Sequence, residues 1–157
     1  MMRLPPFTYV APLTVADAAR ALSQHGSAAM LVAGGTDLYP NMKRRQFEPR
    51  VLVGLRGVRE IEGVRGTPRA GLTIGATTTL SAVAEHGDVA RHFGALATAA
   101  GLVSSPQLRN MGTLGGNLCV DTRCNYYNQS FSWRKAVGFC MKKDGDICLV
   151  APRSPRC

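Results

Sequence analysis

Residues 31–38 read Leu31-Val32-Ala33-Gly34-Gly35-Thr36-Asp37-Leu38, an apolar run that passes directly into two glycines and a hydroxyl residue. The run begins at Ala28, and a continuous apolar stretch of this length is typical of a buried strand. Glycines after such a strand let backbone N–H groups approach a phosphate closely. The spacing is neither a Rossmann fingerprint nor a P-loop, so on its own the segment is better explained as a tight turn without a ligand.

The segments around this loop predict a small α/β lobe over residues 1–59. We expect strands at 7–10 and 50–55, and a helix that Thr14 caps and that ends at Gly26. The order strand, helix, strand, glycine loop, short helix, strand is typical of this class.

A second lobe is predicted over residues 60–118. It contains short strands at 60–65 and 71–76, a helix capped by the threonines at 77–79, and an alanine-rich helix at 89–101 that cannot continue past Pro106.

A second glycine-rich segment lies in this lobe, where residues 109–117 read RNMGTLGGN. Alone, such a segment is more often a strand–turn element than a ligand site. Two glycine loops in one chain favour a dinucleotide, because its pyrophosphate needs hydrogen-bond donors from two sides.

The two segments, residues 32–38 and 107–117, resemble the FAD-gripping loops of the medium subunits of the xanthine dehydrogenase and carbon monoxide dehydrogenase family. The resemblance implies an α+β fold, a two-lobed FAD-binding domain of the PCMH or carbon monoxide dehydrogenase flavoprotein type. Family members continue beyond the last residue of this chain, so we expect the C-terminal part of that domain to be missing. The implied FAD contacts are Leu31, Val32, Ala33, Gly34, Gly35, Thr36, Asp37, Leu38, Val103, Thr113, Leu114, Gly115, Gly116 and Asn117.

Residues 119–157 have a different character and gather all five cysteines and the only tryptophan. They show no clear periodicity and are predicted to be a cysteine-rich insertion loop. Four cysteines in this segment could hold a [4Fe–4S] cluster or zinc, but their spacing matches neither ferredoxin runs nor zinc-binding pairs. Unligated cysteines, zinc and a cluster therefore stay open on spacing alone.

The residues around these cysteines, at 121–129, 133–136 and 140–145, closely resemble an insertion in the flavoprotein subunits of 4-hydroxybenzoyl-CoA reductases. The resemblance implies a [4Fe–4S] cluster held by Cys124, Cys140, Cys148 and Cys157, with Cys119 a packed residue near the flavin. The nearby aromatic side chains are then expected to shield the cluster from water.

The same resemblance implies an electron-transfer role in a larger enzyme that removes the hydroxyl group of an aromatic CoA thioester. A molybdenum-cofactor subunit would hold the catalytic site, a further subunit would carry [2Fe–2S] clusters, and ferredoxin would donate electrons. This chain contains no Ser/His/Asp constellation and no defensible carboxylate pair, so no catalytic residue is predicted in it.

The composition of the chain limits the other functions that the sequence could have. The net charge of +9 suits an anionic partner, and no secretory signal or apolar stretch of membrane-spanning length is present, which predicts a cytoplasmic protein without a membrane partner. One alternative is a basic, zinc-binding module that contacts nucleic acid. Our prediction, however, is that the protein has no nucleic-acid partner. The other is a flavin-binding scaffold without a cluster.

Overall fold

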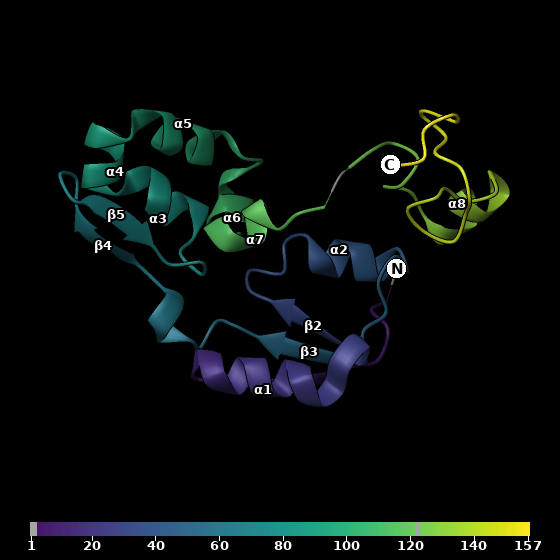
Figure 1. Cartoon of the computed structure of the whole chain (residues 1–157), viewed down its shortest axis with the longest axis horizontal. Helices are drawn as coiled ribbons and strands as arrows, with labels where there is room; N and C mark the ends of the chain where they lie inside the picture. Colours follow the sequence, from purple (N-terminus) through teal and green to yellow (C-terminus); the bar gives the residue numbers. More distant parts are fainter. Residues whose placement is uncertain (1–2, 122) are drawn as a thin grey trace. The chain divides into compact units, whose positions relative to one another are not determined.

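The structure is a computed structural model that describes residues 3–121 and 123–157 (Figure 1). Contacts divide the chain into two compact units. We call Pro6–Asp37 together with Pro49–Val120 the sheet unit. The tail unit consists of Leu38–Glu48 and Asp121–Cys157, with the described residues that precede Pro6.

The sheet unit begins with a parallel three-stranded sheet in the order β1-β3-β2. Its elements are β1 (Thr8–Val10), α1 (Val15–His25), a 3-10 turn (Gly26–Ala28), β2 (Ala29–Val32) and β3 (Val51–Gly54). The central strand β3 is buried along its whole length, whereas β2, which was expected to be the buried strand, is buried only at Val32 because it lies at the edge of the sheet. These three strands and α1 confirm the α/β reading of the first segment.

Helix α1 lies along one face of this sheet (Figure 1). Its small residues Ala18 and Ala21 pack against Val51 and Val53 and form the first hydrophobic core. The hydroxyl of Thr14 caps the helix by accepting a hydrogen bond from a backbone N–H in the first turn. Both predicted ends of the helix are therefore confirmed, because Gly26 terminates it with a positive φ of 50°.

An antiparallel hairpin and a group of helices complete the sheet unit. The elements are a 3-10 turn (Arg59–Ile61), β4 (Val64–Thr67), β5 (Gly71–Ile74), α3 (Leu80–Glu85), α4 (Gly87–His92), α5 (Gly94–Leu102), α6 (Pro106–Arg109) and α7 (Leu114–Leu118). Leu80, Val83, Val89 and Ala100 form the second core, against which the hairpin packs. Figure 1 shows α3, α4 and α5 gathered beside β4 and β5.

Two predicted elements differ from the structure. The helix expected at 89–101 is two helices, because the chain leaves helical geometry at Phe93 (φ −131°, ψ 48°). The strand expected at 60–65 starts only at Val64, because the carbonyl of Ile61 accepts hydrogen bonds from the N–H and the hydroxyl of Thr77, at 2.9 and 2.7 Å. The second difference arises from a contact between residues sixteen positions apart, which local sequence does not encode.

The tail unit contains α2 (Leu38–Lys43) and α8 (Phe131–Ala136). Its two chain segments are joined by buried side chains rather than by a sheet. Arg134, only 1% exposed, donates to the carbonyls of Arg44 and Arg45 at 3.3 and 3.4 Å, and the Gln46 amide donates to the carbonyl of Tyr127. None of the helices in the described chain is long and apolar enough to cross a lipid bilayer.

Candidate nucleotide site and cysteine segment

The first glycine loop follows β2 and touches the second one directly. A Cβ on Gly34 would lie 1.9 Å from the carbonyl oxygen of Met111, so only glycine fits there. Gly35 has a positive φ of 70°, which also favours glycine. Among the described residues, the backbone N–H groups of Gly34, Gly35 and Thr36 have no hydrogen-bond acceptor. This loop therefore offers three adjacent free donors.

The second glycine segment forms α7 and packs against the turn before α3. Its backbone donors are already engaged: Leu114 with the Thr78 carbonyl at 2.8 Å, Gly115 with the Ala76 carbonyl at 2.9 Å, Gly116 with the Thr113 hydroxyl at 3.1 Å and Asn117 with the Thr113 carbonyl at 2.9 Å. A Cβ on Gly115 would lie 2.7 Å from the Ala76 Cβ. Close packing thus explains the glycines of this segment without a ligand.

A cavity of about 270 Å³ lies within the sheet unit where the two glycine segments meet. Its lining comes from both loops, from the residues after β3 and from the turn before α3: Ala33, Gly34, Arg56, Arg59, Glu62, Thr77, Thr79, Asn110, Met111 and Thr113. The volume is just below the range of roughly 300–1,000 Å³ typical of small-molecule sites. It therefore suits part of a dinucleotide, such as its phosphates, rather than the whole.

The charges at this cavity leave a net positive potential. Arg59 forms a salt bridge with Glu62, so these two side chains neutralise each other. Among the described residues Arg56 forms no salt bridge, and its guanidinium Nη2 contacts the Met111 sulfur at 3.7 Å. This cation lines the cavity together with Gly34, whose free N–H is followed along the chain by those of Gly35 and Thr36. The combination favours an anionic ligand.

Three of the predicted FAD contacts, Ala33, Gly34 and Thr113, line this cavity. Leu31 and Val32 lie on β2, Gly35, Thr36 and Asp37 continue the loop, Leu38 begins α2 in the tail unit, and Leu114, Gly115, Gly116 and Asn117 form α7. Val103 packs against the second core, and its carbonyl accepts a hydrogen bond from Arg109 at 3.0 Å.

Sequence reasoning missed several lining residues. Arg56 is one of many basic residues, and Thr79 was recognised only as the cap of α3, a role that the structure confirms. Asn110 and Met111 stand inside the quoted second segment but were not singled out. Only the contact between the loops reveals their place at the cavity.

The four predicted cluster ligands all belong to the tail unit, whereas Cys119 belongs to the sheet unit. Cys140 is buried, Cys124 and Cys148 are half-buried, and Cys157 is exposed. The Cys124 sulfur accepts a hydrogen bond from the Tyr127 N–H at 3.3 Å. Within residues 3–121 and 123–157, no three Cys, His, Asp or Glu side chains are gathered closely enough to hold a metal ion. The thiols as placed do not fit a formed cluster site.

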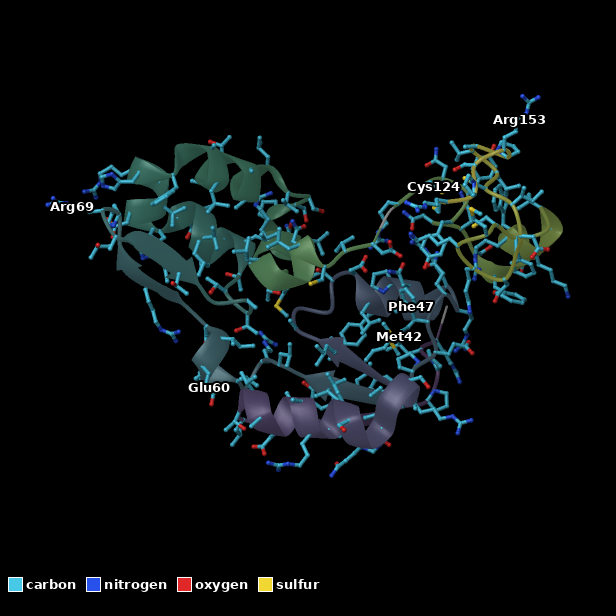
Figure 2. All side chains as sticks on the ribbon, viewed as in Figure 1. Met42, Phe47, Glu60, Arg69, Cys124 and Arg153 are labelled. Carbon is cyan, nitrogen blue, oxygen red and sulfur yellow. The ribbon has the colours of Figure 1, made fainter. Side chains whose placement is uncertain are left out.

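Two aromatic side chains of the tail unit, Phe131 and Phe139, flank an arginine. The guanidinium of Arg134 lies 5.9 and 5.8 Å from the rings of Phe131 and Phe139, within cation–π range. Its Nε and Nη1 atoms have no hydrogen-bond partner in the described chain. Trp133 and Tyr126 contact each other at 6.1 Å and are partly exposed. Figure 2 shows Cys124 within this unit and Arg153 extending away from it.

A larger hollow of about 420 Å³ also lies in the tail unit, lined by Arg45, Gln46, Glu48, Phe131, Lys143 and Asp144. Its charges cancel in two pairs, Arg45 with Glu48 at 3.5 Å and Lys143 with Asp144 at 3.3 Å. The described side chains that line it therefore carry no net charge, unlike those of the smaller cavity.

The sequence and the fold of this chain are both similar to those of known proteins. Residues 5–144 match the family described as the FAD binding domain in molybdopterin dehydrogenase. The carbon monoxide dehydrogenase medium chain of Hydrogenophaga pseudoflava is 39% identical over 114 residues, 73% of this chain. The solved structure of that carbon monoxide dehydrogenase, in a form lacking the Mo-pyranopterin moiety, superposes with a TM-score of 0.71 over 74% of this chain. This likeness confirms the predicted fold class.

A second relative extends the match toward the carboxyl end. The aldehyde oxidoreductase FAD-binding subunit PaoB of Escherichia coli (strain K12) is 34% identical over 142 residues, 88% of this chain. A match of that length necessarily includes part of the cysteine segment. This chain spans 39% and 44% of the lengths of the Hydrogenophaga and PaoB proteins, respectively.

Proposed function

The chain belongs to the family of FAD-binding domains of molybdopterin dehydrogenases, and we propose that it carries FAD as an electron-transfer component of a molybdenum-containing oxidoreductase. The observation that carries the proposal is the cavity beside the first glycine loop, where three backbone N–H groups are free. These donors and the net positive charge suit the FAD diphosphate. FAD supplies the redox chemistry when bound, and the protein's residues bind and orient it.

Different residues of the sheet unit would bind the FAD phosphates and support the binding loop. Gly34, Gly35 and Thr36 would hold the phosphates through their N–H groups. The second segment supports them from behind, because Met111 contacts Gly34 and the α7 backbone is tied to the turn before α3. Its contribution to FAD would come from side chains, such as those of Thr113 and Asn117, rather than from its engaged backbone.

The finer proposal concerns the parent enzyme. We propose a complex like 4-hydroxybenzoyl-CoA reductase, with a molybdenum-cofactor subunit, a [2Fe–2S] subunit and ferredoxin as electron donor. A [4Fe–4S] cluster would be held by Cys124, Cys140, Cys148 and Cys157. Two observations support this proposal. The segments 121–129, 133–136 and 140–145 resemble the insertion of the 4-hydroxybenzoyl-CoA reductase flavoprotein subunits, and all four cysteines belong to one unit. The described thiols would have to be drawn together, as occurs where ligand binding is coupled to folding.

An aldehyde-oxidising complex is a second candidate for the parent enzyme. The match to the aldehyde oxidoreductase subunit PaoB reaches into the cysteine segment, so a segment of this kind also fits that chemistry. The two candidates share the FAD role and differ in the substrate of the molybdenum partner.

Cofactor content after anaerobic purification tests these proposals together. We expect about one flavin per chain, and four irons with four acid-labile sulfides if the cluster is present. Cys140→Ser should then remove the iron, whereas Cys119→Ser, in the other unit, should leave it unchanged. A chain that takes up no flavin on reconstitution would contradict the FAD proposal, and zinc in place of iron would contradict the cluster.

A further inference from the structure

Arg56 is the uncompensated cation of the nucleotide cavity. It follows β3, lines the cavity, and forms no ion pair with a carboxylate among the described residues. Its recorded contact is with the sulfur of Met111, at 3.7 Å. A thioether is a weak acceptor, so this contact orients the guanidinium while leaving nearly all of its five N–H donors available.

Arg59, three residues later, provides the contrast. It lines the same cavity, but its guanidinium is bound to the Glu62 carboxylate, which also lines the cavity. That pair contributes no net charge, and its donors are partly used. Of the two arginines, only Arg56 brings a positive charge that an incoming anion can neutralise.

The surroundings of Arg56 define what it would bind. The same cavity includes Gly34, whose N–H is free together with those of the next two residues. Backbone N–H groups and a planar guanidinium both match phosphate oxygens, and a guanidinium can bridge two of them. The two kinds of donor come from different chain segments, as a diphosphate with oxygens on opposite sides requires.

We propose that Arg56 is a diphosphate-binding residue, which donates hydrogen bonds to the non-bridging oxygens of the FAD diphosphate and which Met111 positions. This inference rests on the proposed FAD function for the identity of the dinucleotide. It assigns to this arginine the charge recognition that the glycine loop alone does not provide.

Equilibrium titration of the flavin-free chain with three ligands tests the proposal. FAD and ADP contain a diphosphate, and riboflavin contains none. Arg56→Gln should weaken binding of FAD and ADP by roughly tenfold to a hundredfold, the range for one hydrogen bond to a charged group. Riboflavin binding should be unchanged. Because Arg56 is exposed, its contribution should also decrease with added salt.

The matched control is Arg69→Gln, which removes the same charge from an exposed arginine of the sheet unit that does not line the cavity. The FAD and ADP affinities of this variant should change less than about threefold. Circular dichroism and thermal unfolding of each variant check that folding is preserved.

Two outcomes distinguish this inference from the proposed function. Equal FAD and ADP affinities for the parent chain and Arg56→Gln would overturn the inference and leave FAD binding in place. ADP binding that depends on Arg56, without FAD binding, would support the inference and contradict the FAD proposal. A chain that binds neither diphosphate, or a variant that loses riboflavin equally, would overturn the inference.

Discussion

Replacing Gly34 with alanine tests whether the two glycine segments touch as described. The new Cβ would lie 1.9 Å from the Met111 carbonyl oxygen and 2.7 Å from the Met111 carbonyl carbon. Both atoms are backbone, so no side chain can rotate away to make room. The segments would have to separate by roughly an ångström, and overpacking of this kind costs about 1–3 kcal/mol.

Thermal unfolding should show this cost directly. For a chain of this size, a change of 1 kcal/mol shifts Tm by about 2–4 °C, so we expect Gly34→Ala to melt about 2–12 °C lower. The displaced N–H groups should also weaken FAD binding by roughly tenfold or more, the value of one charge-assisted hydrogen bond. Equilibrium titration of the flavin-free variant measures that loss.

Gly94→Ala is the matched control, since a Cβ on Gly94, the first residue of α5, meets nothing within 4 Å. Alanine there should be neutral, or stabilising by at most about 1 kcal/mol. If Gly34→Ala melted within a degree of the Gly94→Ala variant and bound FAD equally well, the close approach of Gly34 to Met111 would be refuted.

Three further predictions concern other contacts. Gly115→Ala should destabilise the protein by about 1 kcal/mol, and its Tm should fall less than that of Gly34→Ala. The reason is that the nearest atoms of Ala76 would lie 2.7 and 2.8 Å from the new Cβ, which is a less severe overlap. Arg134→Ala should destabilise the tail unit by about 2–5 kcal/mol, as measured by proteolysis. Arg134→Met should cost less than half of that, because methionine keeps the side-chain volume and removes two unpartnered donors. Burial, and secondarily the Asp121 carboxylate, raises the pKa of Tyr127. The native state therefore retains the proton longer than the unfolded state, and stability should fall as pH rises above about 10, with a smaller fall in Tyr127→Phe.

Local signals in the sequence predicted the framework well where they involve neighbouring residues. Thr14 and Gly26 bound α1, and Thr79 caps α3, because capping uses donors within one helical turn. The strand at 50–55 was predicted correctly, but the burial expected for the apolar run at 28–32 was wrong, since Val32 is the only buried residue of β2. The break at Phe93 was missed, because an alanine-rich segment has high helix propensity on both sides of it.

The candidate site was harder to predict from the sequence, because a glycine that allows close backbone packing and a glycine that exposes N–H groups to a ligand look the same in the sequence. The glycines at 34 and 115 both allow backbone contacts within the protein, yet only the first loop keeps its N–H groups free. No local pattern distinguishes these cases. Arg56 was missed for a related reason, since its lack of an acidic partner depends on Glu62 pairing with Arg59 instead.

The division of the residues between the two units predicts that the two proposed cofactors depend on separate mutations. Every residue that lines the nucleotide cavity belongs to the sheet unit, and all four predicted cluster ligands belong to the tail unit. Mutations at sites that share no packing partner have effects that add independently. Cys140→Ser should therefore remove iron while leaving the FAD affinity within about twofold, and Arg56→Gln should weaken FAD without changing the iron content. A Cys140→Ser chain that lost flavin together with iron would show that the tail unit contributes to the FAD site, which would contradict a nucleotide site built from the sheet unit alone.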